Sequence, residues 1–239
     1  MYQEKDEIFE GKKAVVSGGS SGIGLAITTK LAAEGIVTAI ADLHVPARLP
    51  ENCLSFKCDV SNGQDVNALF TQVQENIGVP DILICGAGRG IHEKLTEGDP
   101  EKWRLILETN LLGALRMVRA FVPGMLEAGQ GDVVFVSSVS AHQTYPYGGI
   151  YAASKAALEV VAETLRQEVL PHIRVTIVAP GVTDTAFFEN TISGFHTVDD
   201  IGYGAVSPEQ VADAVLYALK QPPGVSLNYI TIRPTSQPF

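Results

Sequence analysis

The sequence predicts a single α/β domain built on a doubly wound parallel β-sheet with helices on both faces. Short, almost wholly apolar segments alternate with amphipathic helical segments along the chain, which is the order that parallel sheets require. The apolar segments lack a polar side, as expected of strands that helices cover on both faces. With 239 residues, of which 46% are hydrophobic and 18% charged, the chain can bury a full core. No repeat, low-complexity tract or linker divides it, so we expect one domain over residues 1–239.

The first half of the chain combines short apolar runs with helices that carry apolar residues on one face. A glycine-rich turn joins the first strand to the first helix. The predicted elements are strands at 14–16, 37–41, 54–57 and 81–85, with helices at 25–34 and 66–74.

The second half repeats the alternation with longer helices. Pro171 ends the helix that opens at Tyr151, and Ser207 caps the last helix. The predicted elements are helices at 103–126, 151–170 and 208–220, with strands at 132–136, 175–178 and 227–232. This order again favours parallel pairing through helical crossovers.

Composition excludes several classes of function. A net charge of −10 disfavours nonspecific binding to nucleic acid or to an anionic membrane. No apolar run reaches the ~20 residues of a membrane span, and the polar N-terminus does not resemble a signal peptide. Cys53, Cys58 and Cys85 are odd in number and lack metal-type spacing, so we expect reduced thiols in a cytoplasmic protein. The five histidines are scattered, and we expect no metal site.

The turn from Gly18 to Gly24 follows the first strand and opens the first helix. Glycines allow a backbone to approach a pyrophosphate closely, and a helix N-terminus presents unpaired amides to it. An ordinary flexible turn would also be rich in glycine, but its place between strand and helix favours dinucleotide binding.

Asp42 ends the second predicted strand, where a carboxylate can accept hydrogen bonds from an adenosine ribose. The same carboxylate would repel a 2′-phosphate ~5 Å away by roughly 3 kcal/mol at a dielectric of about 20. Ser21 and Leu43 offer no compensating cation. The sequence therefore favours NAD, while the nearby His44 and Arg48 leave NADP open.

Tyr151 and Lys155 lie one turn apart on a predicted helix, and Ser138 precedes them. A phenol titrates near ~10, so acid/base work at neutral pH requires a pKa shift of roughly three units, or about 4 kcal/mol. A cation about 4 Å away at a dielectric of about 20 supplies about that much before desolvation is subtracted. Alone, this spacing also fits an ordinary amphipathic helix, but the remaining motifs favour a catalytic group.

These motifs, in this order, resemble the short-chain dehydrogenase/reductase family over essentially the whole chain. The segments that match are Ser17–Gly24 (TGxxxGxG, with serine for threonine), Cys58–Val60, Cys85–Gly88 (NNAG, with cysteine for asparagine), Asn110, Ser138, Tyr151, Lys155 and Pro180–Thr185. The resemblance implies a Rossmann fold and an NAD(P)-dependent oxidoreductase that interconverts a secondary alcohol and a ketone. Ser17 keeps the hydroxyl of the usual threonine, whereas Cys85 loses an amide that helps to hold the cofactor region.

The resemblance also implies roles for individual residues. Ser138 would bind the substrate carbonyl, Tyr151 would be the general acid/base, and Lys155 would lower the pKa of Tyr151 and bind the nicotinamide ribose. Asn110 would hold a water that links Lys155 to solvent. The residues expected to contact the cofactor are Ser17, Gly18, Ser20, Ser21, Gly22, Ile23, Gly24, Asp42, Asp59, Val60, Cys85, Gly86, Ala87, Gly88, Asn110, Tyr151, Lys155, Pro180, Gly181, Thr183 and Thr185.

Substrate specificity is expected from residues 89–92, 140–149 and 186–206. The candidate pocket residues are Arg89, Ser138, Ser140, His142, Gln143 and Tyr151. Segment 186–206, with Phe187, Phe188 and Phe195, fits either a mobile lid or a surface loop whose aromatic side chains join the core. Arg89 could pair with a substrate carboxylate or be a solvated arginine.

The tail at 227–235 resembles that of a subgroup of the family that includes small 3-hydroxy-acid dehydrogenases, and members of this subgroup generally favour NADP. For the choice of cofactor we rely on Asp42 instead, because its charge acts directly on the 2′-phosphate that distinguishes NADP from NAD. Small 3-hydroxy or 3-oxo acids, acyl thioesters, sugars and fused-ring alcohols all stay open as substrates.

Two other classes fit less well. A dinucleotide-sensing regulator without catalytic activity would have no reason to keep Asn110, Ser138, Tyr151 and Lys155 together. An extended epimerase or dehydratase usually carries GxxGxxG and a larger C-terminal domain. Apolar residues around the helices at 103–126 and 151–170, among them Ala152, Ala153, Ala156 and Ala157, predict a homodimer or homotetramer.

Overall fold

The structure is a computed structural model that describes residues 8–46, 48–194 and 198–238. One seven-stranded sheet with every neighbouring pair parallel takes the strand order β3-β2-β1-β4-β5-β6-β7. The strands are β1 (Lys13–Ser17), β2 (Val37–Asp42), β3 (Cys53–Lys57), β4 (Ile82–Cys85), β5 (Gly131–Val136), β6 (Ile173–Pro180) and β7 (Tyr229–Ile232). The predicted fold class, a doubly wound parallel sheet, is confirmed.

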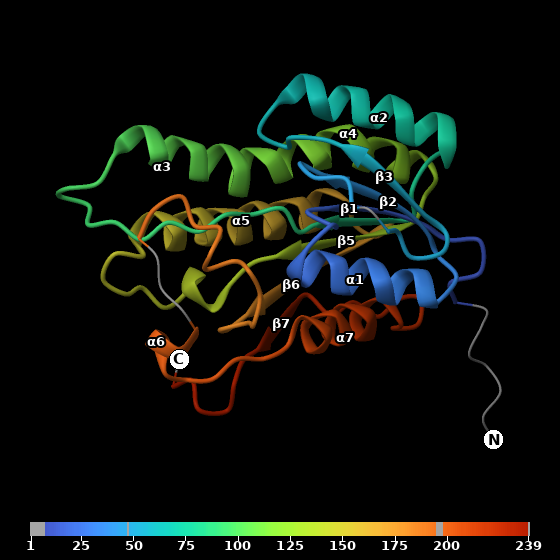
Figure 1. Cartoon of the computed structure of the whole chain (residues 1–239). Coiled ribbons are helices and arrows are strands. Elements are labelled where there is room, and N and C mark those ends of the chain that lie inside the picture. Colours follow the sequence, from blue (N-terminus) through green and yellow to red (C-terminus); the bar gives the residue numbers. More distant parts are fainter. Residues whose placement is uncertain (1–7, 47, 195–197, 239) are drawn as a thin grey trace.

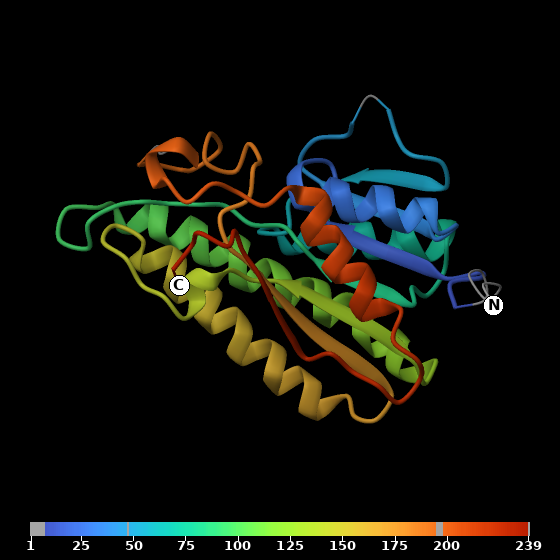
Figure 2. The ribbon, with the colours of Figure 1, turned by 90° about the horizontal axis from the view of Figure 1, so that it is seen from below.

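The helices cover both faces of this sheet (Figure 1). They are α1 (Gly22–Ala33), α2 (Gly63–Asn76), α3 (Pro100–Leu107), α4 (Gly113–Glu127), α5 (Gly149–Glu168), α6 (Val198–Ile201) and α7 (Pro208–Leu219), with a π-helical turn η1 (Glu108–Leu112) and a 3₁₀ turn η2 (Val139–Ala141). Helices α2, α4 and α5 lie on one face, and Figure 2 shows α1 and α7 together across the other.

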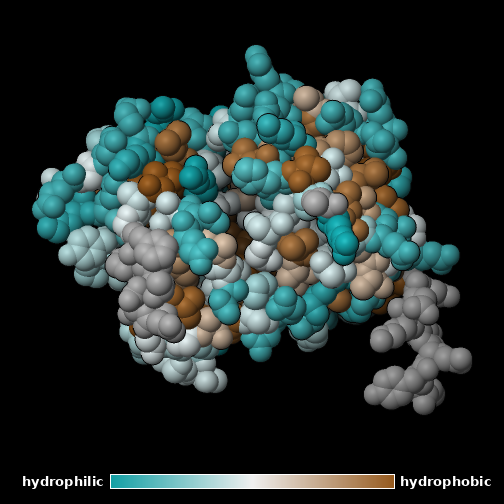
Figure 3. Space-filling view, viewed as in Figure 1, coloured by the Kyte–Doolittle hydropathy of each residue, from teal (hydrophilic) through white to brown (hydrophobic). Residues whose placement is uncertain are grey.

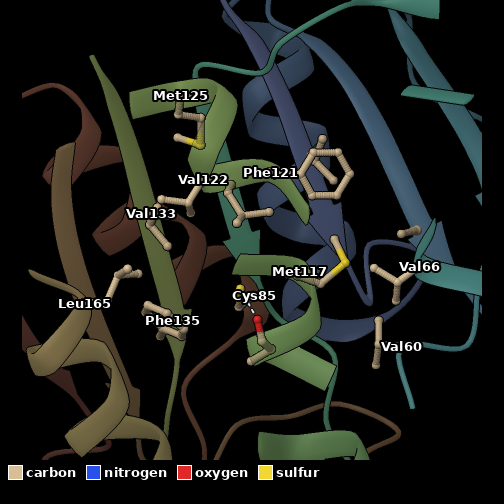
Figure 4. Close-up of a cluster of buried hydrophobic side chains, with 14 of the residues drawn as sticks. Val60, Val66, Cys85, Met117, Phe121, Val122, Met125, Val133, Phe135 and Leu165 are labelled. Atoms are coloured by element: carbon tan, nitrogen blue, oxygen red, sulfur yellow. Dashed lines mark hydrogen bonds between the residues drawn. The ribbon is translucent and has the colours of Figure 1, made fainter. Parts of the chain in front are cut away.

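Alternate residues of the apolar strands feed two separate cores. Val15 of β1 packs with the cluster under α2, α4 and α5, whereas its neighbours Ala14 and Val16 pack under α1 and α7. Figure 4 shows the first cluster, in which side chains of α4 pack over the sheet: Val122 lies beside Val133 of β5, and Phe121 lies on the side of α2, against Phe70. Burial on both faces explains why these strands contain so few polar residues.

The sheet reverses its winding between β1 and β4, because β2 and β3 lie to one side of β1 and the later strands lie to the other. At such a switch point the loops beyond the carboxyl ends of the two strands separate and leave a crevice. The glycine turn after β1 and the segment after β4 form the two sides of this crevice.

Most elements differ from the sequence-based expectation by a few residues at their ends, α6 (Val198–Ile201) was not expected, and the helix expected at 103–126 differs most. The helix expected at 103–126 is three consecutive pieces, α3, η1 and α4, and it begins earlier, where Asp99 caps Pro100 by accepting a hydrogen bond from the N–H of Glu101. The last strand is shorter, since pairing with β6 starts only at Tyr229. Within the described residues, no helix is long and apolar enough to cross a bilayer.

Candidate active site

A cavity of about 1020 Å³ occupies the crevice at the carboxyl ends of the strands. Figure 3 shows a hollow near the centre of the molecule, between α1 and the segment that carries α6. Most of the predicted site residues line the cavity: Gly18, Ser21, Gly22, Ile23, Gly24, Asp42, Asp59, Val60, Gly86, Ala87, Gly88, Arg89, Ser138, Ser140, Gln143, Tyr151, Lys155, Pro180, Gly181, Thr183 and Thr185. The structure therefore brings together segments that are far apart in the chain.

The glycine turn after β1 is shaped by close backbone contacts. Gly18 has φ +72°, and a Cβ there would lie 2.9 Å from the backbone of Ala87. A Cβ on Gly24 would collide with the carbonyl oxygen of Gly18. Only glycine fits these two positions, so the turn can approach a ligand with its bare backbone at the N-terminus of α1.

Asp42 anchors this turn at the end of β2. Its carboxylate accepts hydrogen bonds from the N–H of Ser20 (3.0 Å) and from the N–H of His44 (3.2 Å). The carboxylate is thus held on the cavity wall beside the glycine turn. Asp59, on the next strand loop, caps its own turn by accepting bonds from the N–H and hydroxyl of Ser61.

Ser17 links the ends of β1 and β4 from behind the cavity wall. Its hydroxyl donates to the carbonyl of Ile84 (3.2 Å) and accepts from the N–H of Gly86 (3.1 Å) and of Ala87 (3.3 Å). These bonds hold the segment after β4 against the glycine turn. The expectation that serine keeps the useful hydroxyl of the usual threonine agrees with this geometry.

Cys85 does not reach the cavity. Its thiol is buried in the core between the sheet and α4, with Sγ 4.0 Å from the carbonyl oxygen of Ala114 (Figure 4). Burial raises the pKa of this thiol to about 12. The side chain of Cys85 therefore cannot contact a cofactor in the cavity, because it points from β4 towards α4.

Tyr151 and Ser138 meet at the inner end of the cavity. Ser138 caps η2 just after β5, and its hydroxyl accepts from the N–H of Ser140 (3.2 Å). Tyr151 lies in the first turn of α5, is buried, and packs against Phe187 with ring centroids 5.6 Å apart. Burial raises the pKa of Tyr151 above its usual value, the neighbouring phenol of Tyr145 adds to the increase, and a hydrogen bond with Ser138 opposes it.

Lys155 lies one turn further along α5. Its Nζ donates to the carbonyl of Val136 (2.8 Å) and lies 5.9 Å from the ring centroid of Tyr151. Burial lowers the pKa of Lys155 to about 8, and the carboxylate of Glu159 opposes this decrease. The expected lowering of the pKa of Tyr151 by Lys155 stays a prediction.

Asn110 lies behind the wall in the π-helical turn η1. Its Oδ1 accepts from the N–H of Arg89 (2.8 Å), and its Nδ2 donates to the carbonyl of Arg89 and to Oγ of Ser154, each at 3.0 Å. Both amide protons are used, so this side chain could hold a water only through the second lone pair of Oδ1. A Cβ on Gly88 would lie 3.4 Å from both Asn110 Oδ1 and Lys155 Nζ, so both polar atoms lie close to that glycine.

On the substrate side, His142 lies outside the cavity. Its imidazole is 63% exposed and pairs through Nε2 with the carboxylate of Glu159 at 2.6 Å. The sequence did not single out Tyr145, whose hydroxyl lies 3.2 Å from Nε2 of His92 and which lines the cavity together with His92, Phe187 and Tyr203. It also missed Gln237, whose Oε1 accepts from the N–H of Val182 (3.0 Å) at the cavity wall.

The segment from residue 186 to residue 194 runs along the loop after β4. The N–H of Ile192 donates to the carbonyl of Gly90 (2.9 Å), and the N–H of His92 donates to the carbonyl of Ser193 (3.0 Å). The hydroxyl of Ser193 also donates to the carboxylate of Glu93. Phe187 and Phe188 are half-buried in the cavity wall, and Phe195 lies outside the described residues.

Comparison with known proteins gives concordant matches. A family model described as short chain dehydrogenase matches residues 12–194. An uncharacterised oxidoreductase of Staphylococcus saprophyticus is 32% identical over 239 residues, which cover 94% of this chain and 98% of that protein. An alcohol dehydrogenase from the archaeon Thermococcus sibiricus, solved with 5-hydroxy-NADP, is 28% identical with a TM-score of 0.82 over 95% of this chain and 97% of its own. A 3-ketoacyl-(acyl-carrier-protein) reductase from Brucella melitensis, solved with NADH, shares the fold with a TM-score of 0.85 at 23% identity, over 95% of this chain and 98% of its own.

Proposed function

The chain belongs to the short-chain dehydrogenase family and is an oxidoreductase, and we propose that it interconverts a secondary alcohol and a ketone using a nicotinamide dinucleotide, with Tyr151 as the general acid/base. The observation that carries this proposal is the continuous cavity of about 1020 Å³. Its wall holds the glycine turn and Asp42 as well as Ser138, Tyr151 and Lys155.

The cavity wall fits a dinucleotide. Besides Gly18, which must stay free of a side chain, Gly22 faces Thr185, and a Cβ there would lie 3.3 Å from the threonine methyl group. These glycines and the N-terminus of α1 suit the pyrophosphate, while Lys155 suits the hydroxyls of the nicotinamide ribose. Bound there, the cofactor supplies or accepts the hydride.

The side chains handle the oxygen of the substrate and its proton. In reduction, the hydroxyls of Ser138 and Tyr151 donate hydrogen bonds to the carbonyl oxygen and stabilise its developing negative charge. Tyr151 then passes its proton to that oxygen. Its raised pKa keeps the phenol protonated at neutral pH, which suits this direction. In oxidation the proton returns to Tyr151, and the charge of Lys155 must then lower the pKa of that phenol.

We favour NAD over NADP. The Asp42 carboxylate is held on the cavity wall by two N–H groups, and a 2′-phosphate ~5 Å away would be repelled by roughly 3 kcal/mol at a dielectric of about 20. The archaeal relative was solved with an NADP derivative, so measurement with both cofactors is the deciding comparison.

For the substrate we favour a small 3-hydroxy or 3-oxo acid, or its thioester. Arg89 lines the cavity, is exposed and, among the hydrogen bonds described, makes its contacts to Asn110 through its main chain. Its guanidinium is therefore a candidate partner for a substrate carboxylate. Sugars and fused-ring alcohols are the competing substrates, and a panel should contain all four kinds.

The test is turnover of the nicotinamide chromophore with NAD and with NADP against that panel, alongside Tyr151→Phe. We expect Tyr151→Phe to abolish turnover, because the phenylalanine has no proton to transfer, and to leave NADH affinity within a few fold. Retention of more than about a tenth of the wild-type kcat would contradict the role of Tyr151. Tight NADH binding by the wild type without turnover of any substrate would favour a dinucleotide-sensing regulator instead.

A reducing, cytoplasmic setting is also proposed. Cys53, Cys58 and Cys85 are buried free thiols, and burial raises their pKa values to about 11, 12 and 12. Buried thiols of this kind are unreactive and are typical of proteins that do not rely on disulfides.

A further inference from the structure

A second polar cluster lies directly behind the catalytic side chains, centred on Glu159 of α5. Glu159 is 8% exposed, yet its carboxylate has three partners. Ser137 donates to Oε1 (2.7 Å), the hydroxyl of Tyr229 donates to the same oxygen (3.2 Å), and Nε2 of His142 lies 2.6 Å from Oε2. The partners come from the end of β5, from β7 and from the residue that follows η2. A buried carboxylate with partners on three elements fixes how those elements meet.

The cluster continues the contacts of the catalytic residues. Three consecutive residues at the end of β5 each interact with one residue of α5, and these α5 residues are spaced four apart along the helix. Val136 accepts from Lys155 and Ser137 donates to Glu159. The hydroxyl of Ser138 acts on Tyr151, whose pKa it lowers. Since residues four apart lie on one face of a helix, two hydrogen bonds join the end of β5 to successive turns of α5, and Ser138 interacts with Tyr151 one turn earlier on the same face.

We infer that Glu159 is a positioning residue, which sets the placement of Ser138 and Tyr151 by holding the end of β5 against α5. This inference rests on the proposed function. The titratable groups that contact Glu159 or interact with its charge, among the described residues, are Lys155 on its own helix, His142 after η2 and Tyr229 on β7. The carboxylate supports the ammonium form of Lys155 against the effect of burial. Loss of its charge should therefore act on Lys155, and loss of its hydrogen bonds should act on Ser138.

Two substitutions separate these effects. Glu159→Gln keeps an acceptor for Ser137 but removes the charge, so we expect kcat at neutral pH within about threefold of the wild type. In the pH profile of kcat for Glu159→Gln, the decrease at high pH should move to lower pH by roughly half a unit to one unit. The reason is that the ammonium of Lys155 loses the nearby negative charge that stabilises it. Glu159→Ala also removes the link to Ser137, and we expect kcat to fall at least about tenfold while the KM changes less. Ser137→Ala removes the same link with the charge retained, and it serves if Glu159→Ala does not fold.

Glu163→Gln is the matched control, because Glu163 lies one turn further on α5 and pairs with Arg166 at the surface. It should leave both kcat and the pH profile unchanged. A Lys155 side-chain titration followed by NMR gives a readout without substrate. The pH at the midpoint of this titration should be lower in Glu159→Gln than in the wild type and unchanged in Glu163→Gln. If that midpoint stays in both variants, or if Glu159→Ala and Ser137→Ala keep wild-type kcat, the inference is wrong. If the midpoint shifts in Glu159→Gln but the wild type turns over no substrate, the proposed function fails instead.

Discussion

Asp42 is the residue on which the choice between NAD and NADP most directly depends. Its carboxylate is fixed beside the glycine turn by the N–H groups of Ser20 and His44. We expect Asp42→Asn to raise the ratio of kcat/KM with NADP to kcat/KM with NAD by about tenfold. The full repulsion of roughly 3 kcal/mol corresponds to about a hundredfold, and solvent screening reduces it.

The comparison needs only the two kcat/KM values for each variant. Glu51→Gln is the control, since Glu51 is an exposed carboxylate in the turn before β3. A wild type that prefers NADP, with a ratio that Asp42→Asn leaves unchanged, would show that this carboxylate does not select the cofactor.

At the scale of the residue, the sequence predicted the cavity wall well and the residues behind it less well. The proximity of Tyr151, Lys155 and Ser138 could be predicted, because the first two lie one turn apart on a helix and the third follows the end of a strand. Cys85 could not be assigned to a face, because β4 is apolar throughout and offers no alternation to read. His142 follows the 3₁₀ turn η2, which Ser138 caps, and that turn directs the imidazole towards Glu159.

At the scale of the element, the interruption between α3 and α4 was not predictable from apolar periodicity. The π-helical turn depends on tertiary contacts, since Asn110 within it bonds to the main chain of Arg89 and to Ser154 on α5. By contrast, the start of α3 was available from the sequence, because Asp99 followed by Pro100 is a common helix opening. Short sequence signals such as Asp99-Pro100 can thus indicate where a helix starts. An interruption within a helix depends on contacts with residues far away in the sequence, which the local sequence does not show.

Glu93 joins the loop after β4 to the segment at 186–194 and to the start of α3, and it carries the element-scale prediction. Its carboxylate accepts from Ser193 in the segment over the cavity, from Nε1 of Trp103 on α3 (2.9 Å) and from the N–H of Asp99 (3.0 Å). We expect Glu93→Gln to raise the substrate KM by about tenfold, with NADH affinity within twofold, because the segment over the substrate loses a charge-assisted anchor. Steady-state kinetics and NADH titration check this.

The pH dependence of Glu93 has a definite sign. The hydrogen bond from Ser193, above all, lowers the pKa of Glu93 to about 2, from an ordinary value of 4.5. A lowered pKa in the folded state stabilises the fold above about pH 4.5, and this contribution disappears as the pH falls towards 2. The difference in melting temperature between wild type and Glu93→Gln should therefore shrink in that range. Glu97→Gln, which alters only an exposed pair with Lys94, should show no such pattern, and an equal effect from both variants would count against the anchor.

At the scale of the whole molecule, several large apolar side chains remain exposed on the layer of helices that contains α4 and α5. Leu112 precedes α4, Leu126 lies in its last turn, and both are exposed; Val160 of α5 is 67% exposed. Ala153 on α5 is also exposed, and it lies on the same face of the helix as Val160, two turns away. Ala153 and Val160 form a small apolar strip on α5, and a second copy of the chain could bury this strip and the exposed leucines of α4. Of the alanines on which the sequence-based expectation of an oligomer rested, Ala153 is exposed, Ala156 and Ala157 are half-buried and Ala152 is buried, so the interface stays a prediction.

We therefore expect a homotetramer, of mass 4 × 25.5 = 102 kDa, in which α4 and α5 pack against their copies. Val160→Glu should convert it to a smaller species at micromolar concentration in sedimentation velocity, because an interface of standard size cannot bury an unpaired carboxylate without large cost. Tyr217→Glu is the matched control, since Tyr217 is 63% exposed on α7, on the opposite face of the sheet. A wild type that sediments as a monomer, or equal dissociation by both variants, would mean that the strip on α5 is not the contact between subunits.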